Sequence, residues 1–166
     1  CLAAGMLLSK VLGRDSVGRI KISEHGKPYL ESGEYFNIAH SGNYVVLAVD
    51  NEPVGVDIEQ RRERGYEGIA RLSFHEREQA QLKRSVNRQK TFYELWTLKE
   101  SYMKAVGRGF NLPPKSFYFE LGSPVTLHSK DKEQYRFFIH YGIEDYTIAL
   151  CSKSGRYDGK LIYKAL

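Results

Sequence analysis

The chain of 166 residues is long enough for one domain, or for two small lobes that share a core. Its 42% hydrophobic and 27% charged residues are typical of a globular protein. No stretch approaches the roughly 20 apolar residues that a membrane helix needs, so we expect no membrane partner. The net charge of +5 fits a phosphate-bearing ligand, an acidic protein or nucleic acid, and equally a mildly basic protein with none of these.

The two cysteines, Cys1 and Cys151, have neither the spacing of a disulfide framework nor that of a metal site. This usage is typical of a reducing cytoplasm, so we expect a cytoplasmic protein. Because the sequence begins with Cys rather than Met, we also expect it to start partway through a longer protein.

The first part of the chain predicts one helix followed by short strands. A buried helix is expected over about 2–13, ending near Gly13. Strands are expected at 19–23, at two segments within 36–50 joined by a Ser-Gly-Asn turn, and at 54–60.

The second part predicts the same order of helices and then strands. Helices are expected at 69–74, 75–85 and 88–107, and strands at 116–121, 135–142, 145–152 and 160–165. Gly107 and the later Pro113-Pro114 mark the end of the long helix. The fold class is therefore α+β, with antiparallel sheets and one long central helix.

The long helix carries a charged face that has two interpretations. At about 100° per residue, its apolar stripe is opposite Glu100 and Lys104. The stripe consists of Leu95, Leu98, Tyr102, Ala105 and Val106. Glu100 and Lys104 are either a solvated ion pair or part of a ligand site. Trp96, one turn before Glu100, would be a costly apolar group on a wholly exposed face.

The motif GVDIE, residues 55–59, places Asp57 and Glu59 on the same face of a strand. Two neighbouring carboxylates repel each other, and a cation between them relieves the repulsion. Oxygen ligands favour Mg²⁺, which commonly also binds waters and substrate phosphates. With Glu100 as a third carboxylate, the motif indicates a metal site. The alternative is a half-exposed edge strand whose acids face water.

Two further segments carry basic residues. Lys27 lies in a turn fixed by Pro28, and His40 precedes Ser41 at the end of a strand, where it is either structural or in contact with a ligand. A catalytic triad of Ser41, His40 and Asp57 is excluded, because adjacent side chains on a strand face opposite ways.

Taken in order, GKP, FNIAHSG, GVDIE and WTLKESYMKAVGRGF resemble the 4'-phosphopantetheinyl transferases. The resemblance is to the larger, pseudo-dimeric type that activates non-ribosomal peptide and polyketide synthetases. It implies a single domain, 1–166, of two pseudo-symmetric lobes, about 1–60 and 61–166, each with an antiparallel sheet and a long helix. The short trimeric holo-acyl-carrier-protein synthases share the motifs, but the length of this chain favours the larger monomeric type.

The resemblance implies transfer of phosphopantetheine from coenzyme A to a serine of an apo acyl or peptidyl carrier protein, with Mg²⁺ or Mn²⁺. Carried over residue by residue, Asp57 and Glu100 resemble the principal metal ligands, and Glu59 a third or water-mediated one. Lys104 resembles the lysine beside the pyrophosphate and His40 a phosphate contact. Lys27 and Pro28 resemble the segment along the adenine nucleotide. We hypothesise that Glu100 is the general base, directly or through a metal-bound water.

Other segments leave alternatives open. In FHEREQ, Phe74 and Glu78 resemble a family segment that extends the site, and the alternative for Glu78 is a surface acid on an ordinary helix. The basic stretches RRER and QLKR are complementary to an acidic carrier protein. A non-catalytic module that binds coenzyme A or the carrier protein is the alternative function. Nucleic-acid binding is not favoured, because the basic residues are scattered among acids.

Two departures from the family accompany the resemblance. Ala39 stands where many relatives have a serine before the histidine, and the N-terminal basic segment of the family does not precede Cys1. We therefore expect a truncated form of the larger type.

Overall fold

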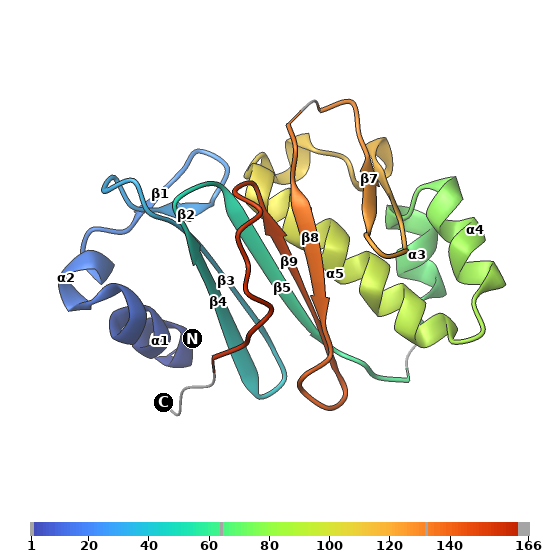
Figure 1. The fold of residues 1–166 in the computed structure, drawn as a ribbon, viewed down its shortest axis with the longest axis horizontal. Coiled ribbons are helices and arrows are strands. Elements are labelled where there is room, and N and C mark those ends of the chain that lie inside the picture. Colours follow the sequence, from blue (N-terminus) through green and yellow to red (C-terminus); the bar gives the residue numbers. More distant parts are fainter. Residues whose placement is uncertain (1, 64, 132, 163–166) are drawn as a thin grey trace.

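The computed structural model describes residues 2–63, 65–131 and 133–162. Antiparallel sheets lie in the middle of the molecule, with α1 (Leu2–Leu12) at one end and the long α5 (Arg88–Val106) beside β5 and β9 (Val54–Gln60 and Tyr146–Ser152; Figure 1). This architecture confirms the α+β class. Among the helices of the described residues, none is long and apolar enough to span a membrane.

The first part of the chain forms two short helices and five strands. The elements are α1 (Leu2–Leu12), α2 (Arg14–Val17), β1 (Lys21–Ile22), β2 (Pro28–Tyr29), β3 (Tyr35–Ser41), β4 (Tyr44–Asp50) and β5 (Val54–Gln60). The expected helix, the two strands within 36–50 and the strand at 54–60 are confirmed, while the expected strand 19–23 is only the two residues of β1. The helix α2 and the strand β2 were not expected. The expectation of a buried helix is wrong, since no residue of α1 is buried and Leu2 is 82% exposed. The helix packs against α2 and β4 at the edge of the molecule, which leaves its other sides open (Figure 1).

The second part forms three helices, two 3₁₀ turns and four strands. The helices and turns are α3 (Glu67–Ser73), α4 (Glu76–Arg84), α5 (Arg88–Val106), η1 (Gly109–Asn111) and η2 (Pro114–Ser116). The strands are β6 (Tyr118–Glu120), β7 (Thr126–His128), β8 (Arg136–His140) and β9 (Tyr146–Ser152). The three helices are confirmed, and β7 was not expected. Residues 160–162 of the expected strand 160–165 are not in a strand, and the rest of it lies outside the described residues.

The strand β5 joins the two parts of the chain. It pairs along its whole length with β9, from Val54 opposite Ser152 to Gln60 opposite Tyr146, and β9 pairs in turn with β8. A sheet therefore crosses the expected lobe boundary near residue 60. The division into lobes 1–60 and 61–166 stays a prediction.

The helix α5 packs directly on β5 and β9, and this contact positions the site. A Cβ atom placed on Gly55 would lie 2.0 Å from the carbonyl oxygen of Ser101, so the backbones of β5 and α5 meet where a side chain would not fit. Of the expected stripe, Leu95, Leu98, Tyr102 and Ala105 are at most 3% exposed, whereas Val106 is half-buried.

Both ends of α5 carry capping groups. The Asn87 side chain accepts a hydrogen bond from the Lys90 amide at the N-terminus. Gly107 ends the helix in the left-handed region, at φ 71°, where glycine has no Cβ penalty. The long helix thus begins and ends where its sequence predicts.

Candidate active site

Asp57 points from β5 toward α5 and meets Lys104. Its Oδ1 accepts a hydrogen bond from the Lys104 Nζ at 2.6 Å, while Oδ2 is buried without a hydrogen-bond partner among the described residues. The pKa of Asp57 is raised to about 7, because burial, together with the Glu59 and Glu100 carboxylates, outweighs the lowering effect of Lys104. An unpaired buried oxygen costs free energy, so it is a natural position for a ligand.

The alternative of an exposed edge strand is wrong for Asp57. The strand β5 pairs with β9 and also contacts β3 and α5, and residues 54–58 are all buried. Asp57 itself is only 5% exposed. The acid is thus held inside the molecule, where its charge requires a partner.

Glu59 lies two residues further along β5 and is held by two side chains. Its Oε1 accepts a hydrogen bond from the Trp96 indole Nε1 at 3.3 Å, and its Oε2 accepts one from the Ser41 hydroxyl at 3.2 Å. Trp96 therefore connects α5 to β5 and gives its polar edge a partner. Sequence reasoning did not find the role of Ser41, because the contact depends on how β3 packs beside β5.

Glu100 lies on α5 one turn before Lys104 and is half-buried. Burial raises the pKa of Glu100, Lys104 lowers it, and Glu59 raises it. None of the side chains in the described part of the chain donates a hydrogen bond to its carboxylate. Glu100 therefore keeps its oxygens available to a ligand.

The pocket beside these residues lies between the turn before β2 and the C-terminal half of α5. It has a volume of about 420 Å³. Its lining comprises His25, Gly26, Lys27, Pro28, Asn37, Glu100, Met103, Lys104, Gly107 and Gly109. The structure thus brings Lys27 and Pro28 to the same pocket as Glu100 and Lys104.

Lys27 closes the pocket against the end of α5. Its Nζ donates hydrogen bonds to the carbonyl oxygens of Ala105 at 2.9 Å and of Val54 at 3.4 Å. A cation at this position is favoured by the carbonyl groups of the helix terminus. Burial lowers the pKa of Lys27. The ammonium therefore fixes the turn on α5 and β5.

His40 lies apart from this pocket. It is exposed on β3, opposite Val45, and does not belong to the lining. Ser41, the next residue, points the other way and meets Glu59, as adjacent residues on a strand must. Asn37 on the same strand was missed from the sequence. It is 5% exposed, lines the pocket, and accepts a hydrogen bond from the Val56 amide at 2.8 Å.

Phe74 and Glu78 are fully buried, at 0% exposed each, and neither lines the pocket. The interpretation of Glu78 as a surface acid is wrong. Glu78 forms an ion pair with Lys99 at 2.9 Å, and neither residue lines the pocket. A partner on a distant segment is needed for such burial, and the local polar pattern does not reveal it.

The carboxylates fit a hard divalent cation that is held together with a ligand. Among the described residues, no three His, Cys, Asp or Glu side chains already form a metal cluster. The carboxylates of Glu59 and Glu100 are nevertheless close enough to raise the pKa of Asp57, and that of Glu59 also raises the pKa of Glu100. Their donors are all oxygen, and Mg²⁺ usually takes one or two carboxylates, several waters and substrate phosphate oxygens. Together with the unpartnered Asp57 Oδ2, this donor set matches Mg²⁺.

The chain belongs to the 4'-phosphopantetheinyl transferase superfamily, whose family model matches residues 53–151. The matched range contains Asp57, Glu59, Glu100 and Lys104, so the family assignment and the candidate site fall on the same part of the chain. The resemblance inferred from the motifs is confirmed at the level of the superfamily.

Several curated relatives resemble the chain over most of its length. The 4'-phosphopantetheinyl transferase gsp of Aneurinibacillus migulanus is 39% identical over 78% of this chain and 56% of its own length. A 4'-phosphopantetheinyl transferase of Bacillus subtilis is 36% identical over 87% of this chain and 67% of its own length. Sfp of Bacillus subtilis strain 168 is 33% identical over 81% of this chain and 62% of its own length. These similarities group the chain with the larger Sfp-like type.

The chain spans between 56% and 67% of the length of these relatives. Among solved structures, the holo-[acyl-carrier-protein] synthase of Thermotoga maritima matches with a TM-score of 0.52 and 21% identity, over 60% of this chain and 61% of that one. At this identity the match supports the fold, which is thus of the 4'-phosphopantetheinyl transferase kind.

Proposed function

We propose that the chain transfers 4'-phosphopantetheine from coenzyme A to a serine of an apo acyl or peptidyl carrier protein. The observation that carries the proposal is the Asp57–Lys104 pair, with Asp57 Oδ2 unpartnered among the described residues and Glu100 and Lys104 on the wall of the pocket. Membership of the superfamily supports the reaction class. The relatives with 33% to 39% identity are themselves 4'-phosphopantetheinyl transferases.

In the proposed reaction, the serine oxygen forms a bond to the β-phosphorus of coenzyme A. The bond from that phosphorus to the bridging oxygen breaks, and adenosine 3',5'-bisphosphate leaves with the bridging oxygen. Negative charge builds on the phosphate oxygens, and the Lys104 ammonium stabilises it. When bound, Mg²⁺ or Mn²⁺ would supply further neutralisation of the diphosphate.

Asp57 and Glu100 are the proposed principal metal ligands, and Glu59 is a third or water-mediated one. The unpartnered Oδ2 supports the role of Asp57, and the place of Glu100 on the pocket wall supports that of Glu100. Glu59 already accepts hydrogen bonds from Trp96 and Ser41, which supports an indirect role.

Glu100 is also the proposed acceptor of the serine proton. Its raised pKa makes this carboxylate a stronger base than one of ordinary pKa. Binding to a cation lowers a carboxylate pKa, so the proton would then pass through a water held by Glu100.

Lys27 and Pro28 are proposed to lie along the adenine nucleotide, since both line the pocket with Lys104. The Lys27 ammonium is engaged by the carbonyl oxygens of Ala105 and Val54, so the nucleotide would meet its carbon chain and the turn. His40 lies outside this lining. We therefore propose that it contacts a phosphate on a part of coenzyme A that extends beyond the pocket along β3.

Two exposed arginines offer a surface for the carrier protein. Arg62 and Arg84 lie in the basic stretches RRER and QLKR, and they support binding to an acidic carrier protein.

We propose that the protein works as a cytoplasmic monomer. The free, buried Cys151 is compatible with a reducing environment.

The test is an intact-mass measurement of an apo carrier protein incubated with the chain, coenzyme A and Mg²⁺. We expect the carrier to gain one phosphopantetheine group, and EDTA to abolish the gain. The Glu100→Gln variant, which keeps the shape of the side chain, is expected to lose the activity even at saturating Mg²⁺. Binding of coenzyme A without any mass gain would instead identify a non-catalytic module.

A further inference from the structure

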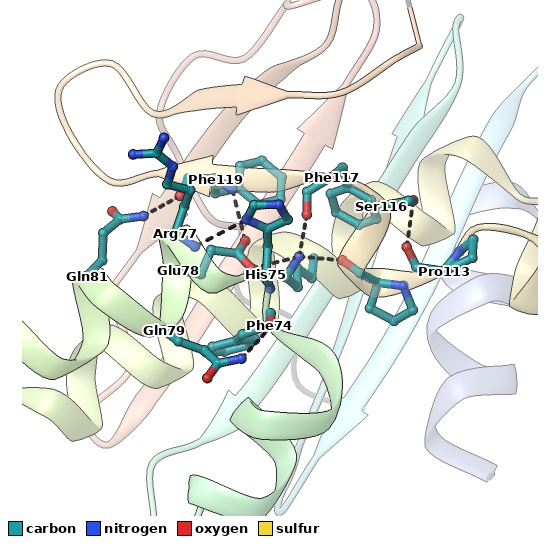
Figure 2. Close-up of polar contacts among 12 residues, drawn as sticks. Phe74, His75, Arg77, Glu78, Gln79, Gln81, Pro113, Ser116, Phe117 and Phe119 are labelled. Carbon is teal, nitrogen blue, oxygen red and sulfur yellow. Dashed lines mark hydrogen bonds and ion pairs between the residues drawn. The ribbon is translucent and has the colours of Figure 1, made fainter.

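A buried ion pair outside the pocket joins three segments of the fold. The Lys99 Nζ lies 2.9 Å from Oε2 of Glu78, and the two side chains are 1% and 0% exposed. Lys99 also donates to the carbonyl oxygens of Pro114 at 2.7 Å and of Phe117 at 3.0 Å (Figure 2). An ammonium group has three hydrogen-bond donors, so all three of them are used.

Glu78 is satisfied from its own side. Its Oε2 accepts a hydrogen bond from the His75 amide and its Oε1 one from the Phe119 amide, both at 2.9 Å. These contacts tie the N-terminus of α4 and the start of β6 to the middle of α5 (Figure 2). The pair therefore holds α5 from a side that the pocket does not reach.

We propose that Glu78 and Lys99 are positioning residues, which fix the rotation of α5 so that Glu100 and Lys104 face Asp57. The proposal rests on the proposed transferase function. Neither residue lines the pocket, so neither is assigned a contact with substrate.

The adjacency of Lys99 and Glu100 on α5 makes this coupling direct. Successive side chains of a helix are about 100° apart, so Lys99 faces residues 114–119 while Glu100 faces the pocket. A carboxylate about 6 Å from the helix axis moves by about 1 Å when the helix turns by about 10°. A misplacement of about 1 Å costs a catalytic group about 10²-fold in rate.

The chemistry of the pair suits positioning better than stability alone. Apolar side chains of similar volume often replace a buried ion pair with no loss of stability. The five hydrogen bonds of Glu78 and Lys99, in contrast, have fixed directions and resist both rotation and sliding of α5.

The test compares three variants with the wild-type chain. Lys99→Met leaves the Glu78 charge buried without its partner, whereas Glu78→Gln/Lys99→Met removes both charges. Leu82→Ala on α4 is the control, because Leu82 is a buried core residue outside the pocket and the ion pair. For each variant we would measure the thermal unfolding midpoint, kcat and the KM for the carrier protein, well below the unfolding midpoint.

An independent readout is the indole N–H signal of Trp96 in a ¹H–¹⁵N NMR spectrum. The chain has a single tryptophan, and its indole donates across the α5–β5 contact to Glu59. This signal reports the orientation of α5 without requiring any activity.

The double variant is expected to unfold at a higher temperature than Lys99→Met and still to have a kcat about 10- to 100-fold below wild type, with an unchanged KM for the carrier. Its Trp96 indole signal is expected to shift. Leu82→Ala should lower the unfolding midpoint while keeping kcat and the Trp96 signal. A double variant with wild-type kcat and an unmoved Trp96 signal would overturn the positioning role.

Failure of the proposed function gives a different result. Wild-type chain that transfers nothing would refute the transferase activity, whatever the variants do. The Trp96 signal would then still decide whether Glu78 and Lys99 orient α5.

Discussion

The helix α5 carries two lysines that each meet a buried carboxylate, and the two pairs differ in how completely they are satisfied. Lys99 and Glu78 are sealed, at 1% and 0% side-chain exposure, and the three N–H donors of Lys99 all have acceptors. Lys104 is 29% exposed, and its partner Asp57 has one oxygen without a hydrogen bond from the described residues.

This difference indicates that the Lys99–Glu78 pair holds the fold together, whereas the Lys104–Asp57 pair belongs to the candidate active site. Burial raises the pKa of both Glu78 and Asp57, but two backbone amides and Lys99 oppose the shift at Glu78. At Asp57 only Lys104 opposes it, while Glu59 and Glu100 add to it. A polar group that is buried and left incompletely paired stores a cost that a bound ligand can relieve.

The largest expected effect comes from exchanging the two acids for amides in turn. Asp57→Asn should lower the transfer rate by about 10²–10³-fold, the usual cost of removing one group that stabilises transition-state charge. Its free energy of unfolding should stay the same or rise, because Lys104 can be solvated when its partner is neutral. Glu78→Gln should instead lower the free energy of unfolding by about 3–5 kcal/mol, since Lys99 is left buried with its charge.

Urea denaturation and steady-state kinetics of the two variants check whether Asp57→Asn loses activity without losing stability and whether Glu78→Gln loses stability. Equal losses of stability in Asp57→Asn and Glu78→Gln would show that both pairs hold the fold together. A fully active Asp57→Asn variant would remove Asp57 from the site.

A second prediction concerns the close backbone contact between β5 and α5 at Gly55. Gly55→Ala would place its Cβ 2.0 Å from the Ser101 carbonyl oxygen and 2.5 Å from the Ala105 amide nitrogen. Both atoms belong to the backbone and cannot swing away, so β5 and α5 must separate. We expect a loss of about 1–3 kcal/mol in the free energy of unfolding, the usual range for overpacking, together with reduced transfer activity.

Gly68→Ala is the matched control for this prediction. A Cβ at Gly68, in α3, meets no atom within 4 Å, and alanine favours the helix. Stability equal to or above wild type is therefore expected there. If Gly55→Ala behaved like Gly68→Ala, the β5–α5 contact would not restrict the site.

The part of the site that could be predicted from the sequence follows from local periodicity. The spacing of Asp57 and Glu59 on a strand, and of Glu100 and Lys104 on a helix, assigns each pair to one face without knowledge of the tertiary fold. The resemblance of both motifs to one family then predicts that the strand and the helix meet. In the structure, the Lys104 Nζ lies 2.6 Å from the Asp57 Oδ1. Whether these residues bind a metal stays a prediction.

The rest depends on contacts between distant segments. The sequence does not show that Lys99 lies against Pro114 and Phe117, or that α1 is left exposed beside β4. One local signal for Glu78 existed. It is the third residue after the His75 N-cap, the position at which an acid closes a capping box, and the structure has this arrangement.

The smallest predicted effect concerns Asp50, a carboxylate that is satisfied by hydroxyl groups instead of a lysine. Its Oδ2 accepts hydrogen bonds from Ser154 at 2.6 Å and Ser152 at 2.8 Å, and its Oδ1 accepts one from the Asn51 amide. Partial burial raises the pKa of Asp50, but the hydrogen bonds from Ser154 and Ser152 and from the Asn51 and Glu52 amides together outweigh it and lower the pKa below the ordinary value.

Because the folded state holds the Asp50 proton less tightly than the unfolded state, these bonds stabilise the fold near neutral pH. Their contribution is lost as the pH falls through the pKa of the folded state. Ser154→Ala should therefore lower the free energy of unfolding by about 1 kcal/mol at pH 7 and by less at pH 3. Urea denaturation at both pH values measures the difference, and the same substitution made in an Asp50→Asn background should lose its pH dependence. An equal loss of stability at both pH values would show that Ser154 stabilises the fold without depending on the charge of Asp50.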